Sequence, residues 1–175
     1  MLKFLLIAAI IAGAVVICIL VLAATKPARY AIQRTITVQA AREKVFDLIN
    51  DLRRWPEWSE ERDDSTIRRS YSGPPAGKGA ICESESSRNK VRIEIIESSP
   101  DMVRLQADWA RPFAARNINI FTLEPQGNAT RVTWALDGEN VFMLKVMTVF
   151  VSVDRLMGGH FEAGLASLKT AAEKQ

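Results

Sequence analysis

The first 25 residues constrain the chain more than any other feature, because residues 4–24 form a run of 21 residues without a charge. At a rise of about 1.5 Å per residue, such a helix spans about 31 Å, close to the hydrocarbon thickness of a bilayer. The run therefore predicts a single transmembrane helix, with residues 1–25 as a membrane anchor. The alternative is a cleaved signal peptide, since Val21, Leu22 and Ala23 fit a small-residue cleavage site, but its apolar region is usually only about 7 to 15 residues long.

The side of the membrane on which the rest of the chain lies stays open. Lys3 and the amino terminus flank one end of the apolar run, and Lys26, Arg29 and Arg34 follow the other end. By the positive-inside rule this difference favours a cytoplasmic domain, but it is too small to decide the orientation.

Residues 26–175 have the composition of one globular domain. Apolar residues make up roughly 41% of them, which is an ordinary value and excludes a disordered chain or a multi-pass transporter. Lys3 is the only charged side chain before position 26, so the formal net charge falls from +3 for the whole chain to +2 for this part. The charges are mixed along the sequence, so no nucleic-acid partner is expected. The two cysteines, Cys18 and Cys82, form no obvious disulfide pair.

The globular part begins with a predicted strand and a predicted helix. Residues 30–38 alternate between polar and apolar side chains, with Ile32, Ile36 and Val38 on one face, as in a half-buried strand. Residues 41–52 follow with an apolar stripe at helical spacing.

Short alternating runs separated by turn residues predict six more strands. They lie at 66–72, 79–86, 91–97, 102–109, 116–123 and 130–137. Their short connections indicate an antiparallel meander. Residues 141–172 contain no proline and repeat apolar residues at helical spacing, so we expect one long helix, kinked or thinned at Gly158 and Gly159. A curved seven-strand sheet is wider than one helix, so a cavity is expected between them, and small molecules bind in such spaces.

Several stretches resemble the START-like superfamily, also called SRPBCC, and within it the polyketide cyclase/dehydrase-like group. The matching stretches are 37–46, 51–59, 71–74 with Gly77 and 79–80, 130–134 and 161–169. The resemblance covers about residues 28–172. It implies an α+β helix-grip fold, with a curved seven-strand antiparallel sheet around a long C-terminal helix. It also implies a hydrophobic ligand, and it carries no shared catalytic constellation over to this chain.

The chain departs from the family pattern at three positions. Cys82 and Ser84 stand where relatives usually carry a tyrosine and a tryptophan, so the cavity is expected to be wider and more polar there. His160 stands where relatives often have a polar or acidic residue.

Ten residues are the candidates for ligand contact, by their place on predicted inward faces or by the resemblance. They are Trp58, Tyr71, Cys82, Ser84, Trp109, Phe121, Trp134, Met143, Met147 and Phe150. Methionine suits a wall that adapts to different ligands. The alternative for each aromatic or methionine residue is dry core, and for Trp58, with Trp55, a seal at one end of the core.

The other polar residues are expected to be structural or solvent-facing. One histidine with Cys82 is a poor donor set, so neither a metal nor a cofactor is expected. A cluster of acidic residues is expected to face solvent, because nearby arginines balance its charge. It comprises Glu57, Glu60, Glu61, Asp63 and Asp64. The residues expected to form cross-strand pairs on the solvent side are Glu83, Glu85, Arg92 and Glu94.

The sequence favours a membrane-anchored domain that binds a hydrophobic small molecule or lipid without catalysis. One alternative is a cyclase- or dehydrase-like enzyme acting on such a ligand, with Tyr71, Cys82, Ser84 and His160 as the candidate polar groups. Another is an interaction module whose apolar surface over residues 141–157 docks on a partner or on the membrane.

Overall fold

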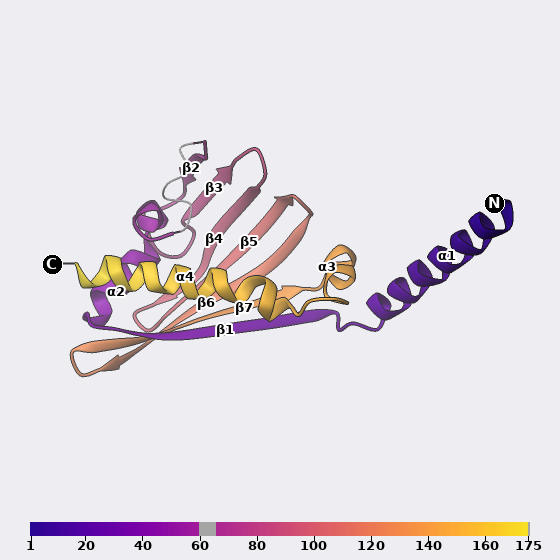
Figure 1. Cartoon of the computed structure of the whole chain (residues 1–175). Coiled ribbons are helices and arrows are strands. Elements are labelled where there is room, and N and C mark those ends of the chain that lie inside the picture. The colour runs from indigo at the N-terminus through magenta and orange to yellow at the C-terminus, as the bar shows by residue number, and fades with distance from the viewer. Residues whose placement is uncertain (60–65, 175) are drawn as a thin grey trace.

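Seven antiparallel strands form one sheet in the order β1-β7-β6-β5-β4-β3-β2. Figure 1 shows the computed structural model, which describes residues 1–59 and 66–174. The strands are β1 (Arg29–Val38), β2 (Arg68–Ser72), β3 (Ile81–Glu85), β4 (Lys90–Ser99), β5 (Met102–Arg111), β6 (Ala115–Gln126) and β7 (Ala129–Glu139). Strands β2 to β7 follow one another as a meander, and β1 pairs with β7 at the other edge. The predicted helix-grip fold and its seven strands are confirmed.

The strand ends differ from the predicted ones. β2 begins at Arg68 rather than at residue 66, and β6 and β7 extend until only two residues separate them. One of these is Gly127, whose φ of 63° is left-handed, as two-residue hairpin turns require. Hairpin pairing thus continues past the point where the apolar alternation in the sequence stops. Four of the acidic residues expected to be balanced by arginines, Glu60, Glu61, Asp63 and Asp64, lie outside the described residues.

The first helix of the globular part is shorter than predicted and is followed by a second turn of helix. α2 (Arg42–Asn50) is followed directly by the 3-10 helix η1 (Leu52–Glu57). Asp51, between them, caps η1, because its side chain accepts a hydrogen bond from Arg53 N (2.9 Å). The last carbonyls of a helix have no partner within it. Here two indole groups supply it: Trp55 Nε1 donates to Ile49 O (2.9 Å) and Trp58 Nε1 to Leu48 O (3.0 Å).

The prediction of one long helix over residues 141–172 is wrong. The structure has two helices, α3 (Phe142–Met147) and α4 (Val153–Glu173). The second helix begins after Ser152, whose side chain accepts a hydrogen bond from Arg155 N (3.2 Å) and so caps it. The glycine pair of residues 158 and 159 lies inside α4, which continues through it.

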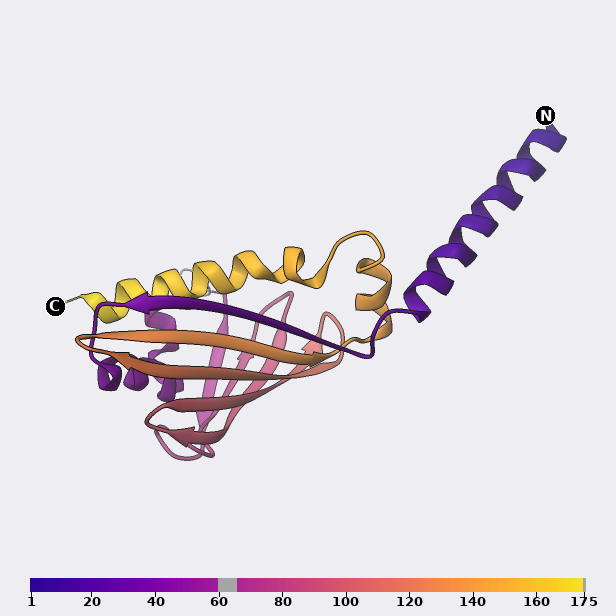
Figure 2. The same cartoon turned by 90° about the horizontal axis from the view of Figure 1, so that it is seen from below.

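α4 packs along the sheet beside β1, on the side that the sheet curves around (Figures 1 and 2). Its buried face includes Phe161, Leu165 and Leu168. The C-terminal end is fixed to β1, where Lys169 Nζ donates to Thr37 O (3.1 Å). α2 packs against both the sheet and α4, so the core is closed at this end of the molecule.

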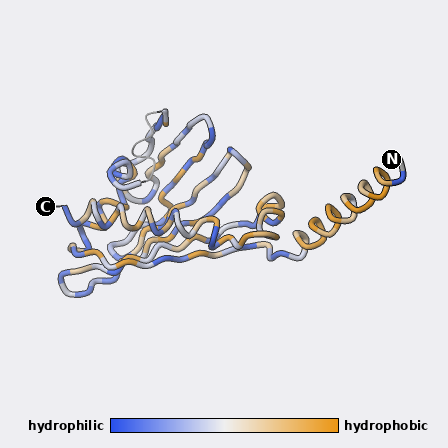
Figure 3. Tube along the Cα trace, in the orientation of Figure 1, coloured by the Kyte–Doolittle hydropathy of each residue, from blue (hydrophilic) through white to orange (hydrophobic). Residues whose placement is uncertain are grey.

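The N-terminal helix α1 (Leu2–Ala24) extends away from the domain (Figures 1 and 2), and it is hydrophobic over most of its length (Figure 3). The stretch Lys3–Ala24 is long and apolar enough to cross a membrane, although a signal sequence would meet the same criteria. The link to β1 is held by Asn140, whose Nδ2 donates to Pro27 O (3.0 Å). The backbone N–H of Asn140 also donates to Ala28 O (2.8 Å).

Candidate functional site

A cavity of about 180 Å³ lies between the sheet, η1 and α4. Most of its lining side chains are apolar. The lining residues are Leu52, Trp55, Trp58, Ser59, Arg69, Cys82, Ser84, Val91, Ile93, Ala107, Trp109, Asn117, Asn119, Trp134, Leu136, Met157, His160, Phe161 and Gly164. An apolar cavity of about 150 Å³ is enough to hold a benzene-sized molecule.

The strand register builds the floor of the cavity. Cys82 on β3 pairs with Ile93 on β4, Ile93 with Ala107 on β5, and Ala107 with Asn117 on β6. Directly paired residues point to the same face of a sheet, so these four side chains form one continuous row. The next row contains Arg69, Ser84, Val91 and Trp109.

One face of α4 forms the roof. Met157, His160, Phe161 and Gly164 follow one another at spacings of three, one and three, which places them on the same side of the helix. Gly164 has no side chain at the point where α4 contacts Trp134 on β7. A Cβ at Gly164 would lie 2.8 Å from Trp134 Cζ3, so the glycine gives the indole its place below the helix.

Aromatic rings form the inner end of the cavity. The Trp134 ring stacks on Phe121 with centroids 4.9 Å apart, and its centroid lies 4.3 Å from that of Phe161. Trp58 lies edge-on to Trp134, with centroids 6.4 Å apart, and 5.2 Å from Trp55. With Trp109 on the floor, all four tryptophans of the chain line this cavity.

A chain of hydrogen bonds crosses the floor on β6 and β7. Trp134 Nε1 donates to Asn119 Oδ1 (2.9 Å), and Asn119 Nδ2 donates to Asn117 Oδ1 (3.1 Å). Asn117 is only 8% exposed, as is Ser84 at the other end of the floor. Together with Ser59, Arg69 and His160, these polar side chains interrupt a mostly apolar wall.

The structure brings together five of the ten candidate ligand residues: Trp58, Cys82, Ser84, Trp109 and Trp134 all line the cavity. The other five lie elsewhere. Tyr71 is half-buried beside Cys82, its partner across β2 and β3, and Phe121 is fully buried under Trp134. The three on or after α3, namely Met143, Met147 and Phe150, are exposed at the end of the domain nearest α1. Ligand contact at all ten stays a prediction.

Sequence reasoning missed Asn117 and Asn119, although the sequence contains a signal for them. On β6 they alternate in phase with Phe121 and Leu123, which are core residues, while the isoleucines between them point to the other face. Two amides at core-facing positions of a strand are unusual, because a buried polar group needs a hydrogen-bond partner. Inward-facing residues alternate along a strand, so counting back by two from Phe121 identifies Asn119 and Asn117 as inward-facing.

Three of the four candidate reactive groups line the cavity: Cys82 and Ser84 from the floor and His160 from the roof. Tyr71 lies outside it, where burial raises the pKa of its phenol and the neighbouring Cys82 raises it further. The guanidinium carbon of Arg53 lies 5.5 Å from the Tyr71 ring centroid. In the described part of the chain, no group of three histidine, cysteine or acidic side chains is placed to hold a metal ion.

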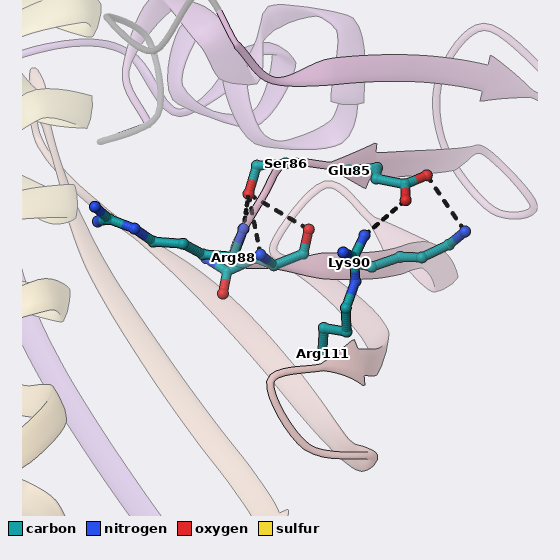
Figure 4. A network of polar contacts seen from close by, with 6 residues as sticks. Glu85, Ser86, Arg88, Lys90 and Arg111 are labelled. Carbon is teal, nitrogen blue, oxygen red and sulfur yellow. Dashed lines mark hydrogen bonds and ion pairs between the residues drawn. The ribbon is translucent and has the colours of Figure 1, made fainter.

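The charged residues of β3 and β4 lie away from the cavity floor, on the solvent side. Figure 4 shows the Glu85 carboxylate between Lys90 (3.3 Å) and Arg111 (2.6 Å), at the ends of three neighbouring strands. Arg92 lies opposite Glu83 and contacts Glu94 (2.8 Å). The expected cross-strand pairing is therefore found only in part: Arg92 faces Glu83 across the strands, Glu85 pairs with Lys90 and Arg111 instead, and Glu94 pairs with Arg92 on its own strand.

Comparisons with known proteins agree with this architecture. A family model described as "Polyketide cyclase / dehydrase and lipid transport" matches residues 29–173. No match was found among curated proteins. Similar solved structures include protein CV1439 from Chromobacterium violaceum, with a TM-score of 0.60, 13% identity, and coverage of 83% of this chain and 98% of that one.

Two more solved structures show the same fold. A protein from Nitrosospira multiformis has a TM-score of 0.61 and 16% identity, over 83% of this chain and 97% of its own. The Aha1 dimer from Colwellia psychrerythraea has a TM-score of 0.56 and 18% identity, over 82% of this chain and 96% of its own.

Proposed function

Because the chain belongs to the polyketide cyclase / dehydrase and lipid transport family, we propose that it is a membrane-anchored domain that binds a hydrophobic small molecule or lipid. The ligand would occupy the cavity between the sheet and α4, and binding rather than catalysis would be its role. The tether would keep the cavity near a bilayer, where apolar molecules concentrate.

The makeup of the cavity wall is the observation that carries this proposal. Four tryptophans and several aliphatic side chains surround a space that the fold leaves unfilled, and only a few polar groups interrupt them. Concave, mostly apolar sites with a few placed polar groups are typical of small-molecule binding. Replacing water there by an apolar ligand is favourable by about 25 cal/mol for each Å² of apolar surface buried.

The surface around α3 supports the membrane part of the proposal. α3 contacts α1, and the exposed side chains there are Phe142, Met143, Met147 and Phe150. Phe150 is 69% exposed and Phe142 is 59% exposed. Large exposed apolar patches mark protein or membrane contacts, and this one adjoins the helix proposed to enter the bilayer. We therefore assign the docking surface expected over residues 141–157 to the same membrane.

An enzyme acting on the bound molecule is the second candidate function. The family description includes cyclases and dehydrases, and Cys82, Ser84 and His160 line the cavity. In this case the same cavity would hold a substrate, and these polar groups would face it.

Analysis of co-purified molecules tests the proposal. The full-length protein would be isolated in lipid nanodiscs and extracted with organic solvent, and the extract analysed by mass spectrometry. A matched variant, Cys82→Tyr with Ser84→Trp, fills the floor and should retain at least about fivefold less of any specifically bound compound, since overpacking costs about 1 to 3 kcal/mol. Equal recovery from both proteins and from empty nanodiscs would contradict binding in this cavity.

Turnover separates the two candidate functions. The extracted compound would be incubated with the wild type and with His160→Gln. A binding protein returns it unchanged with either form. A product formed by the wild type, and lost in the variant without loss of binding, would establish the enzyme instead.

A further inference from the structure

The hydrogen bonds from Trp134 to Asn119 and from Asn119 to Asn117 have a fixed direction. An indole N–H can only donate, so Asn119 must turn its Oδ1 toward Trp134 (2.9 Å). Its Nδ2 then faces Asn117 and donates to Asn117 Oδ1 (3.1 Å). Because the oxygen of Asn117 is used in this way, its Nδ2 group is the free end of the chain.

Among the described residues, the side chain of Asn117 makes one hydrogen bond, through its Oδ1, and its Nδ2 group has no acceptor. Asn117 lines the cavity and is only 8% exposed, and its Nδ2 atom is not among the fully buried atoms, so the donor remains accessible from the cavity. Its partner on β5 is Ala107, whose small side chain leaves room beside the amide. An apolar ligand that filled the cavity would bury this donor without an acceptor at a cost of about 1 to 3 kcal/mol, so a ligand that supplies an acceptor is favoured there.

We propose that the cavity selects apolar molecules that carry a neutral carbonyl oxygen, which accepts a hydrogen bond from Asn117 Nδ2. This inference rests on the proposed function. Asn117 is the residue that recognises the oxygen, and Asn119 and Trp134 position its amide.

The charge distribution of the lining favours a neutral acceptor over a carboxylate. Arg69 lines the cavity four strands away from Asn117, which corresponds to about 19 Å along a sheet with a strand spacing of about 4.8 Å. A carboxylate at Asn117 would therefore have no lysine or arginine of the lining on a neighbouring strand, and burying an unpaired charge is much more costly than burying a neutral carbonyl.

Two probes with the same ring skeleton test the proposal: indane has no polar atom, and 1-indanone adds one carbonyl oxygen. The full-length protein would be labelled with 5-fluorotryptophan and placed in nanodiscs, and binding followed by fluorine NMR. All four tryptophans line the cavity, so each probe is detected where it binds. Each probe partitions into the lipid equally for all protein variants, so comparing variants cancels that effect.

The measured quantity is the Kd of indane divided by the Kd of 1-indanone. In Asn117→Leu, which keeps the size of the side chain but removes the donor, this ratio should fall by about fivefold or more. Asn117→Ala removes the donor and enlarges the cavity, and it should lower the ratio to a similar extent if the leucine variant does not fold. Thr122→Val, which removes a hydroxyl group from the opposite face of β6, should leave the ratio unchanged.

The outcomes distinguish this inference from the proposed function. If both probes bind and the ratio stays within about twofold in the Asn117 variants, the selection of carbonyl compounds is wrong while binding of apolar molecules stands. A ratio that falls as much in Thr122→Val as in the Asn117 variants would also overturn it. If neither probe binds to the wild type, the proposed function itself fails.

Discussion

The guanidinium group of Arg34 on β1 lies against Gly158 on α4, in the space that a side chain at position 158 would occupy. Arg34 Nη1 lies 2.8 Å from Asp154 Oδ1, and Arg34 Nε lies 2.8 Å from Glu162 Oε1. Asp154 and Glu162 stand four residues before and after Gly158, so they share its face of the helix. This arrangement attaches the N-terminal half of α4 to the sheet above the cavity.

Replacing Gly158 or its neighbour by alanine should have different effects. In a helix interior, alanine is more favourable than glycine by about 1 kcal/mol. Gly159→Ala should therefore raise the free energy of unfolding by about 1 kcal/mol, since a Cβ there has no atom within 4 Å. Gly158→Ala displaces Arg34 and weakens both ion pairs, so it should be less stable than Gly159→Ala by about 1 kcal/mol. Urea unfolding followed by tryptophan fluorescence measures the difference.

The same two substitutions in an Arg34→Ala background provide the control. Without the guanidinium group, alanine at position 158 should be tolerated as well as at position 159, and the difference between the two variants should vanish. A difference of unchanged size in this background would show that Arg34 is not its cause.

Gly164→Ala should destabilise the domain by about 1 to 2 kcal/mol after the gain in helix propensity is counted. The new Cβ would lie 2.8 Å from Trp134, whose ring is held by Asn119 and by stacking on Phe121. In fluorine NMR, the Trp134 signal should move more than those of the other three tryptophans. Stability equal to that of Gly159→Ala would mean that the indole is free to shift.

Acid should weaken the attachment of α4. The hydrogen bond from Arg34 lowers the pKa of Asp154 below its ordinary value of 3.8. A carboxyl group with a lowered pKa in the folded state stabilises it fully above its unfolded pKa, and this contribution is lost as the pH falls through the folded pKa. The wild type should therefore exceed Asp154→Asn in stability at about pH 6, and the two should converge as the pH falls below 3.8 and through the lowered pKa of Asp154. A constant difference in urea midpoint across this range would contradict the assignment.

The fold could be predicted further than the site because alternation along a strand is a local signal. The strand of residues 30–38 could be identified from Ile32, Ile36 and Val38 alone, and its phase already fixed which side chains face inward. The break before α4 could not be predicted in the same way, since apolar residues keep helical spacing through it while the capping side chain of Ser152 starts a new helix.

This break also explains where the candidate site residues lie. In the predicted continuous helix over residues 141–172, Met143 and Met147 would lie on the same face as the residues of the cavity roof. In the structure they belong to the separate helix α3, and both are exposed on the surface. Trp109 and Trp134 lie on strands whose phase was predictable, and both line the cavity. That Phe121 is covered by Trp134 depends on tertiary stacking, which no local pattern records.

The anchor prediction concerns α1, whose side chains lie almost entirely outside the packed domain. If α1 crosses a bilayer, the full-length protein should sediment with membranes and resist extraction with alkaline carbonate, because about 20 apolar residues would have to leave the hydrocarbon. A chain that begins at Pro27 should be extracted by carbonate, since it retains only the exposed side chains around α3. Mass spectrometry of the membrane fraction should find the intact N-terminus. A mature protein that begins near Ala24 would instead identify the segment as a cleaved signal peptide and remove the tether from the proposed function.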